Sequence, residues 1–457
     1  MPVESQQVEL LGLAQASELL RAKKLSPVDL TEACLKRIEA LNPELNAFIT
    51  VTSEMALAQA RAADAEILHG AWRGPLHGIP LSLKDLVDVA GVRTTAASAV
   101  FENRVPTEDA EVVRRLKAAG AVIVGKNNLH ECAYGASGVI SRYGPAKNPR
   151  YPGRTTAGSS SGSAAAVAAG LCYGAIVSDT AGSIRLPAAF CGIVGFKPTY
   201  GLVSAGGVIP LSWSLDHIGP MARSVTDAAL ILAAIAGYDP ADPTSRAIAL
   251  EDYAAAMRAP APKLRVGVPR KFFYEGLDPE VVPVVEDALR VVAGLAAEMR
   301  EVSVPVDPDR TVARAEIYAY HGPYAREHAD KYNPETLRRI NAGADVGVHD
   351  YIARRQELEL ARRRIAEIFK NVDVVVTPTT PAPPPLVAEL QADISRLRER
   401  ELLMLRNTWP FNVLGLPAIS VPCGETPDGL PVGLQIAGPA GAEARVLGFA
   451  RAFEGAR

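Results

Sequence analysis

The feature that most constrains the fold is an alternation between short, continuously apolar runs and longer segments with helical periodicity. The apolar runs are typical of strands buried on both faces of a sheet, and they lie at residues 79–83, 121–124, 174–178, 265–268 and 372–377. Segments with a helical pattern separate them, at residues 108–119, 163–169, 226–236 and 279–297. This alternation predicts an α/β fold in which helices cover both faces of a mixed, mostly parallel central sheet.

Both ends of the chain extend this pattern. Residues 10–40 are predicted to be helical, with Ser26 as the N-cap before a proline at the first helical position, and a second helix is expected over 53–68. Toward the C-terminus, the runs AISVPCG and PVGLQIAG predict two strands that return to the same sheet before a last helix. We therefore expect one large domain over residues 1–457.

Four parts are expected within that single domain. They are an N-terminal helical part at about 1–70, a central core at about 71–238, a linker at about 239–262 and a C-terminal part at about 263–457 that completes the sheet. The linker is placed where the composition becomes rich in Pro, Ala and Asp.

Composition excludes several classes of function. With 48% apolar and 22% charged residues, the chain is typical of a soluble globular protein. The 48 Lys and Arg against 51 Asp and Glu give a net charge of −3, which offers no electrostatic basis for binding nucleic acid or an anionic membrane. The five cysteines form no CxxC pair and the seven histidines show no ligand spacing, so no metal site is expected. The N-terminus lacks a signal-peptide pattern, and a cytoplasmic location is therefore expected.

Two short patterns imitate known motifs but lack their context. The run GAVIVGK at 120–126 nearly matches a phosphate-binding loop, but Asn127 stands where Ser or Thr is required. The run GSSSG at 158–162 matches the G-x-S-x-G pattern of α/β-hydrolases, but no hydrophobic strand precedes it. Neither a nucleotide nor any other cofactor is expected.

Three polar segments remain as candidates for chemistry. Lys84 ends an apolar strand, so its aliphatic stem leaves a buried element. The serine block AGSSSGS at 157–163 opens a helix of almost pure Ala and Val, and the segment SDTAGSIRLPA follows at 178–188. Taken singly, these segments are better explained as a surface lysine, a flexible linker or helix cap, and a turn held by an ion pair.

Taken together, the three segments resemble the amidase signature family of serine hydrolases. The lysine, the serine block and the GSIR-P element occur in that family's order, and the spacing between Ser159 and Ser183 matches its pattern. The resemblance continues through CGIVGFKPTYGLVS, SLDHIGP, PFNVLGLPAISVPCG and GLPVGLQIAG, and it covers the chain from about residue 10 to the end.

The resemblance implies a role for each matching residue. Ser183 would be the acylated nucleophile, Ser159 the bridging serine after a cis peptide bond, and Lys84 the base. This assignment is physically reasonable, because a serine hydroxyl needs an adjacent base and burial lowers the pKa of a lysine. The backbone N–H groups of the nucleophile turn would form the oxyanion hole, contributed by Thr180, Ala181, Gly182 and Ser183. Support for the site would come from Ser160, Asp179 and Arg185.

The chain departs from the family pattern beside the nucleophile. It carries Ala181 and Gly182 where the family usually has two glycines, and its serine block reads AGSSSGS instead of GGSSGGS. If the first position required a positive φ, alanine there would cost about 1 kcal/mol or more. Otherwise Ala181 only narrows the pocket. Neither change removes a reacting group.

The implied reaction is hydrolysis of the C–N bond of a small amide, with anilides, carbamates (urethanes), ureas and esters within reach of the same machinery. An apolar amide is favoured, because the chain reads SAGG followed by VIPLSW at 204–213, where the main alternative usually has a charged stretch. That alternative is the A subunit of glutamyl-tRNA(Gln) amidotransferase, which frees ammonia from glutamine within a complex. A second alternative is a non-catalytic binding protein on the same scaffold.

The choice of a small amide as substrate also determines which partners and substrate contacts are expected. The expected partner is a small amide, with nucleic acid involved only under the amidotransferase alternative, and the chain is expected to be a monomer or homodimer. Aromatic and apolar residues outside the regular elements or at their ends are candidates to line the substrate pocket. They are Tyr134, Ile209, Trp213, Tyr318, Tyr320, Tyr324 and Trp409.

Overall fold

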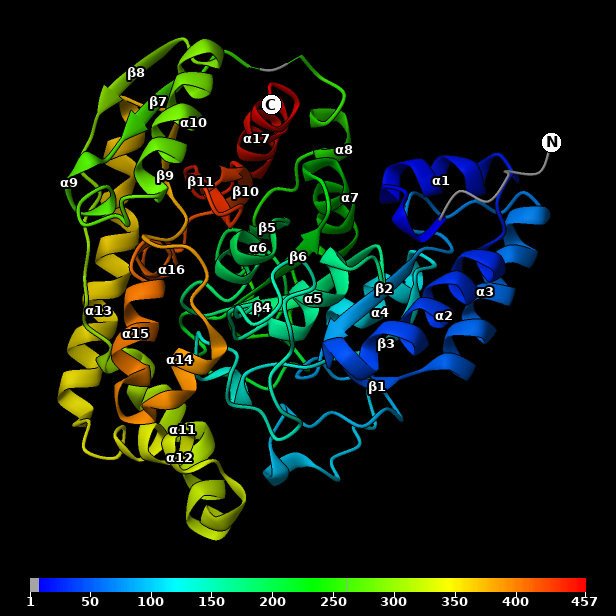
Figure 1. Cartoon of the computed structure of the whole chain (residues 1–457), viewed down its shortest axis with the longest axis horizontal. Coiled ribbons are helices and arrows are strands. Elements are labelled where there is room, and N and C mark those ends of the chain that lie inside the picture. Colours follow the sequence, from blue (N-terminus) through cyan, green and yellow to red (C-terminus); the bar gives the residue numbers. More distant parts are fainter. Residues whose placement is uncertain (1–7, 261) are drawn as a thin grey trace.

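A mixed sheet of eleven strands runs through the part of the chain that the computed structural model describes, residues 8–260 and 262–457 (Figure 1). The strands lie side by side in the order β1-β3-β2-β4-β6-β5-β10-β11-β9-β7-β8. Their bounds are β1 Phe48–Val51, β2 Pro80–Lys84, β3 Val122–Asn127, β4 Gly174–Asp179, β5 Val194–Lys197, β6 His217–Ala222, β7 Arg265–Val268, β8 Glu298–Glu301, β9 Val374–Pro378, β10 Ala418–Glu425 and β11 Pro431–Ala437.

The expectation of a single α/β domain with a mixed sheet is confirmed, but the expectation of mostly parallel strands is wrong. Within the described residues, β2 pairs in parallel with β3 and β4, and β7 pairs in parallel with β8 and β9. The other neighbouring strands are antiparallel. A continuously apolar run shows that a strand is buried on both faces, and antiparallel strands covered by helices share that property.

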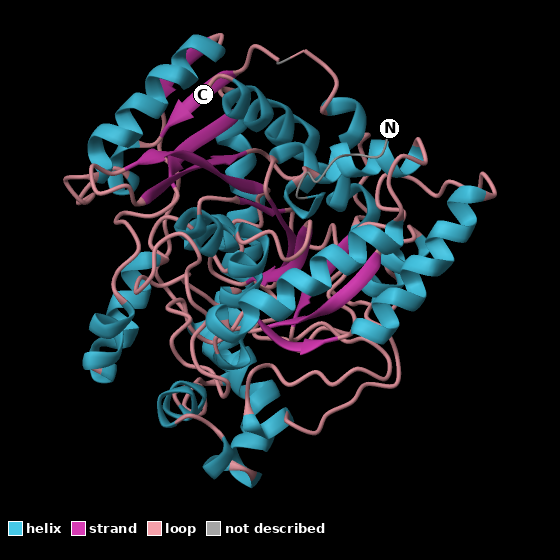
Figure 2. Cartoon of the chain, turned by 45° about the vertical axis from the view of Figure 1, so that its right-hand side comes forward, coloured by secondary structure: helices cyan, strands magenta, loops and turns pink. Residues whose placement is uncertain are grey.

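Helices cover both faces of the sheet, and each face has its own hydrophobic cluster (Figure 2). On one face, α2 (Pro27–Leu45), α3 (Ser53–Leu68), α5 (Ser161–Ala168) and α6 (Arg185–Cys191) contribute to the smaller cluster. The opposite face holds the larger cluster, built by α1 (Leu13–Arg21), α4 (Glu111–Ala118), α7 (Val225–Ile235), α8 (Tyr253–Ala256), α10 (Val281–Leu295) and α17 (Glu443–Gly455).

A group of helices from the second half of the chain packs on one side of the sheet, in yellow and orange in Figure 1. They are α11 (Thr311–Glu327), α12 (Pro334–Asn341), α13 (Val348–Arg364), α14 (Val387–Ala392), α15 (Leu397–Met404) and α16 (Trp409–Val413). The short α9 (Arg270–Phe273) follows β7. No helix of residues 8–260 and 262–457 combines the length and apolarity needed to cross a bilayer.

The predicted elements agree with the structure to within a few residues. Ser26 caps α2, since its side chain accepts a hydrogen bond from the Val28 N–H. The predicted linker at 239–262 contains α8, and Asp239 and Asp242 both accept hydrogen bonds from Ser204. The two C-terminal runs AISVPCG and PVGLQIAG form β10 and β11, as predicted. The search for continuously apolar runs missed β1, β5, β6 and β8.

Candidate active site

Lys84 lies at the end of β2, in the interior of the sheet, and its side chain is fully buried. Its Nζ donates to Ser159 Oγ at 2.6 Å and to Ser178 Oγ at 2.9 Å. Burial lowers the pKa of Lys84 to about 7, although the charges of Asp179 and Asp216 favour the protonated form. A substantial fraction of this amine is therefore neutral near pH 7 and able to accept a proton.

The serine block is a buried segment and not a linker, since Ser159, Ser160, Ser161 and Ser163 are all buried. The peptide bond between Gly158 and Ser159 is cis, and the Ser159 carbonyl accepts a hydrogen bond from the His130 N–H at 2.9 Å. A Cβ on Gly158 would lie 2.9 Å from the Gly138 nitrogen, so only glycine fits there. The first residues of α5 pack equally closely, because a Cβ on Gly162 would collide with the Ala47 carbonyl oxygen.

The turn that carries Ser183 connects β4 to α6. Because β4 pairs in parallel with β2, this turn leaves the sheet at the same edge as Lys84. Lys84 contacts Ser159, and the turn that carries Ser183 begins at the same edge of the sheet. Ser183 itself is almost buried and lines a cavity.

A buried ion pair between Asp179 and Arg185 stabilises the turn that carries Ser183. Asp179 accepts two hydrogen bonds at 3.0 Å from the Arg185 guanidinium and one at 3.1 Å from the Ile184 N–H. Although burial opposes ionisation, the charge of Arg185 holds the pKa of Asp179 well below its usual range. Arg185 also donates to the Thr408 carbonyl and to Gln435 Oε1, and this joins the turn to α16 and β11. Ser160 donates weakly to the Ser178 carbonyl at 3.4 Å.

The departure at Ala181 leaves the turn undisturbed. Ala181 is not among the residues with positive φ, whereas Gly182 has a φ of +143°. A Cβ on Gly182 would collide with the Thr408 side chain, while the Ala181 carbonyl accepts a hydrogen bond from Thr408 Oγ1 at 2.7 Å. The position that requires glycine is therefore the second one, and the chain has glycine there.

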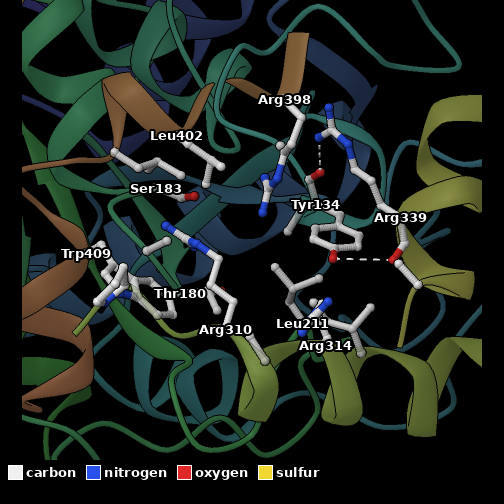
Figure 3. A pocket seen from close by; sticks show the side chains of 18 of the residues that line it. Tyr134, Thr180, Ser183, Leu211, Arg310, Arg314, Arg339, Arg398, Leu402 and Trp409 are labelled. Carbon is white, nitrogen blue, oxygen red and sulfur yellow. Dashed lines mark hydrogen bonds between the residues drawn. The ribbon is translucent and has the colours of Figure 1, made fainter. Parts of the chain in front are cut away.

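Ser183 opens onto a cavity of about 390 Å³ (Figure 3). Its walls come from the turn at 180–183, from the segment around Tyr134, and from α11, α12, α15 and α16. Two of the predicted substrate residues, Trp409 and Tyr134, line it, and five arginines line it as well: Arg310, Arg314, Arg338, Arg339 and Arg398. The sequence favoured an apolar pocket and did not predict these arginines, which lie among mostly apolar lining residues.

A second cavity of about 330 Å³ adjoins the first, because Ala133 and Leu211 line both. Asp216 lies in its wall and accepts a hydrogen bond from Thr180 Oγ1 at 2.6 Å. Burial raises the pKa of Asp216 to about 6. Asp216 thus connects the second cavity to the turn that carries Ser183.

The expected substrate residues divide among three places. Tyr134 and Trp409 line the first cavity, and Ile209, Trp213 and Tyr320 line the second. Tyr318 and Tyr324 line neither cavity and lie within α11, so a contact of either residue with substrate stays a prediction. Tyr324 packs against Phe101 with ring centroids 5.0 Å apart, while the Tyr318 hydroxyl accepts a hydrogen bond from Arg326.

Sequence reasoning missed several residues of the site. Ser178 was available from the pattern, because it lies near the end of the strand that precedes the nucleophile turn. Thr408 and the cavity arginines belong to helices far along the chain, and no local motif marked them.

Comparison with known proteins defines the class of this chain. The Amidase family model matches residues 29–447. The chain therefore belongs to the amidase family, as its resemblance to amidase signature enzymes predicted.

Curated relatives match over nearly the full length. The A subunit of glutamyl-tRNA(Gln) amidotransferase from Geobacter sp. (strain M21) is 41% identical, and the match covers 97% of this chain and 96% of that protein. The protein of the same name from Roseiflexus sp. (strain RS-1) is 42% identical, with the same coverage of 97% and 96%.

Solved structures share the fold. The peptide amidase from Stenotrophomonas maltophilia has a TM-score of 0.84 and 35% identity, covering 98% of this chain and 96% of that one. A chain from a vestigial protein complex related to the origins of an s-triazine catabolic enzyme has a TM-score of 0.90 and 31% identity, covering 97% and 98%.

Proposed function

We propose that the chain hydrolyses the carbon–nitrogen bond of a small amide through an acyl-enzyme on Ser183. One observation carries the proposal: a fully buried Lys84 amine lies 2.6 Å from Ser159 Oγ, at the sheet edge where the Ser183 turn begins. A buried lysine that contacts two serine hydroxyls next to a cavity is a candidate proton acceptor.

The proposed mechanism is a two-step acyl transfer. Ser183 Oγ attacks the amide carbonyl while its proton passes to Ser159, and the Ser159 proton passes to the neutral amine of Lys84. The N–H groups of the turn at 180–183 stabilise the negative charge on the tetrahedral oxygen. The relay then returns a proton to the leaving nitrogen. Water attacks the acyl-enzyme by the same route, which releases the acid and restores Ser183.

Two substrate assignments compete within this mechanism. The names of the relatives at 41% and 42% identity support a glutaminase A subunit of an amidotransferase, which would act with partner subunits. The apolar small amide favoured by the sequence has less support, because arginines line the cavity at Ser183. The peptide amidase neighbour supports a free-standing amidase. Both assignments fit a cytoplasmic protein that needs no cofactor, and carbamates and esters stay within reach of the same serine.

The non-catalytic alternative has the weakest support. A binding protein on this scaffold would have no need to keep Lys84 unprotonated, yet burial holds its pKa at about 7. The contact between Lys84 and Ser159 supports the first link of the proposed proton relay.

The test combines covalent labelling with product release. A fluorophosphonate probe should label wild-type protein and fail to label Ser183→Ala, while the exposed Ser395→Ala serves as the matched control and labels fully. Ammonia or amine release is then measured from glutamine, aliphatic amides, anilides and carbamates, and acid release is measured from esters. Glutamine hydrolysis that requires a partner protein would support the amidotransferase assignment. Absence of both labelling and hydrolysis would sink the proposal.

A further inference from the structure

The cavity that opens onto Ser183 is unusually rich in cations. Its lining includes Arg310, Arg314, Arg338, Arg339 and Arg398, whereas none of the residues that line it is an aspartate or glutamate. Figure 3 shows Arg310 and Arg398 extending into the cavity from opposite sides, with the Arg310 side chain close to Ser183 and Thr180.

Three of these arginines have carboxylate partners behind the cavity wall. Arg338 and Arg339 each donate to Glu335 at 2.7 Å, and Arg339 also donates to Glu401 at 2.6 Å. Arg398 lies 3.7 Å from Glu401. Ion pairing within the protein therefore accounts for the presence of these three cations.

Arg310 and Arg314 differ from the other three arginines in having no carboxylate partner among the described residues. Within residues 8–260 and 262–457, neither guanidinium forms an ion pair or donates a hydrogen bond; Arg314 is exposed to solvent, whereas Arg310 is partly buried. Arg310 stacks on Trp409, with its guanidinium carbon 4.0 Å from the ring centroid. Arg314 follows one helical turn later on α11 and lines the same cavity.

A partly desolvated guanidinium without a counterion is costly, and an incoming anion relieves that cost. Burial and the nearby charge of Arg398 lower the pKa of Arg310 to about 9, so the group still carries its charge at neutral pH. A guanidinium held flat against an aromatic ring keeps its N–H edge free to bind a carboxylate through two parallel hydrogen bonds.

We propose that the amide cleaved at Ser183 carries a carboxylate, which Arg310 binds with Arg314 beside it. This inference rests on the proposed amidohydrolase function and adds a substrate class to it: short monoamides of dicarboxylic acids, the class to which glutamine also belongs. Arg310 is then a specificity-determining residue that contacts substrate. The cavity of about 390 Å³ is within the usual size range of small-molecule sites.

The experiment uses pairs of amides with the same number of carbons. Glutaramate is compared with valeramide, and succinamate with butyramide, so that each pair differs by a terminal carboxylate in place of a methyl group. Ammonia release gives kcat/KM for wild type, Arg310→Gln, Arg310→Lys and the matched control Arg290→Gln, whose arginine is exposed on α10. Thermal melting checks that each variant is folded.

Wild type should prefer the anionic member of at least one pair. Arg310→Gln should lower kcat/KM for that amide by about 10- to 100-fold, the range for a lost charge-assisted hydrogen bond, and leave the neutral amide within about threefold. Arg310→Lys should lose less, and Arg290→Gln should match wild type. A preference for neutral amides, or equal losses on both members in Arg310→Gln, would overturn the inference and leave the amidohydrolase proposal intact.

A binding measurement separates failure of the inference from failure of the proposed function. Calorimetry with Ser183→Ala protein should detect glutaramate or succinamate, and the double variant with Arg310→Gln should bind that amide at least about tenfold more weakly. If Ser183→Ala binds neither anionic amide, the carboxylate site is refuted whatever the wild-type protein hydrolyses. If binding depends on Arg310 but the wild type neither hydrolyses amides nor reacts with the probe, the proposed function fails and the anion site stands.

Discussion

Single residues decide the charge of the proposed base. The Lys84 side chain is fully buried; two serine hydroxyls contact its amine, and two carboxylates, Asp179 and Asp216, act on it from farther away. Desolvation outweighs those carboxylates, because the pKa of Lys84 falls to about 7. A residue that is almost always protonated on a protein surface is thereby brought into the range in which it can act as a base.

The first prediction concerns the pH dependence of amide hydrolysis. Since only the neutral amine accepts a proton, kcat/KM should rise with pH through an apparent pKa near 7 and level off above it. Asp216, with a pKa of about 6, titrates nearby, so Asp216→Asn is the control. The same rise should occur in Asp216→Asn, with its midpoint at a lower pH. The Asp216 carboxylate favours the protonated form of Lys84, so removing its charge lowers the pKa of the lysine. A profile that stays flat from about pH 5 to 8 would contradict the role of Lys84.

The second prediction concerns stability at the base of the nucleophile turn. Asp179→Ala leaves the Arg185 charge buried without its partner, and this should lower the free energy of unfolding by about 3–5 kcal/mol. Chemical denaturation followed by circular dichroism measures the change. Asp287→Ala removes an exposed partner of Arg290 and should leave the midpoint unchanged. Similar midpoints for both variants would refute a supporting role for the buried pair.

The residues of the site differ in how far sequence could reveal them. Lys84, Ser159 and Ser183 belong to three segments that together resemble a family pattern, so sequence could suggest their roles, although each segment alone also fits a structural explanation. Arg310 carries no such signal, because its importance comes from the absence of an acidic partner among the described residues. That absence depends on how α11, α15 and α16 pack around one turn, and local periodicity contains no information about such packing.

At the scale of elements, the turn between β4 and α6 fixes which backbone N–H groups can face a substrate. The third prediction tests it with two opposite substitutions. Ala181→Gly should leave kcat/KM within about threefold, since Ala181 does not have a positive φ. Gly182→Ala should lower kcat/KM by about 100- to 1000-fold, because the new Cβ collides with Thr408 and displaces a donor. Steady-state amide hydrolysis is the measurement, and equal effects of the two changes would contradict this geometry.

Close packing of α5 is the second property that belongs to an element. The fourth prediction compares two helical glycines. Gly162→Ala places a Cβ against the Ala47 carbonyl and should lower stability by about 1–3 kcal/mol. Gly294→Ala, on the exposed side of α10 with nothing within 4 Å of the new Cβ, should raise it by about 0.5–1 kcal/mol. Thermal melting of both variants measures the difference, and the same sign for both would refute the packing argument.

Strands were predicted where they are continuously apolar and missed where they are not. The interior strand β6 reads HIGPMA, and its glycine and proline conceal a fully buried strand. The strand β8 reads EMRE and lies at the end of the sheet order, where charged side chains reach solvent. Strand direction was also beyond the pattern, because β5, β6 and β10 pair antiparallel despite their burial.

For the molecule as a whole, the sheet order joins distant parts of the chain. Strand β5 from the first half pairs with β10 from the second, with Ala418 opposite Lys197 and Ser420 opposite Gly195. Arg185, beside the nucleophile, donates to Gln435 on β11 at 2.7 Å. The second half of the chain therefore completes both the sheet and the support of the site, and we expect neither half to be stable without the other.

The last prediction follows from this interlocked sheet. A specific protease site inserted between the exposed residues Ala249 and Leu250, within the predicted linker, should be cleaved without separating the two fragments. The pairing of β5 with β10 and the contacts of α7 with α17 should hold them together, because both interfaces belong to the hydrophobic core. The cleaved protein should elute from a sizing column at the volume of the uncleaved insert control and keep its reaction with the fluorophosphonate probe. Fragments that separate without denaturant would show that residues 239–262 join two independent domains.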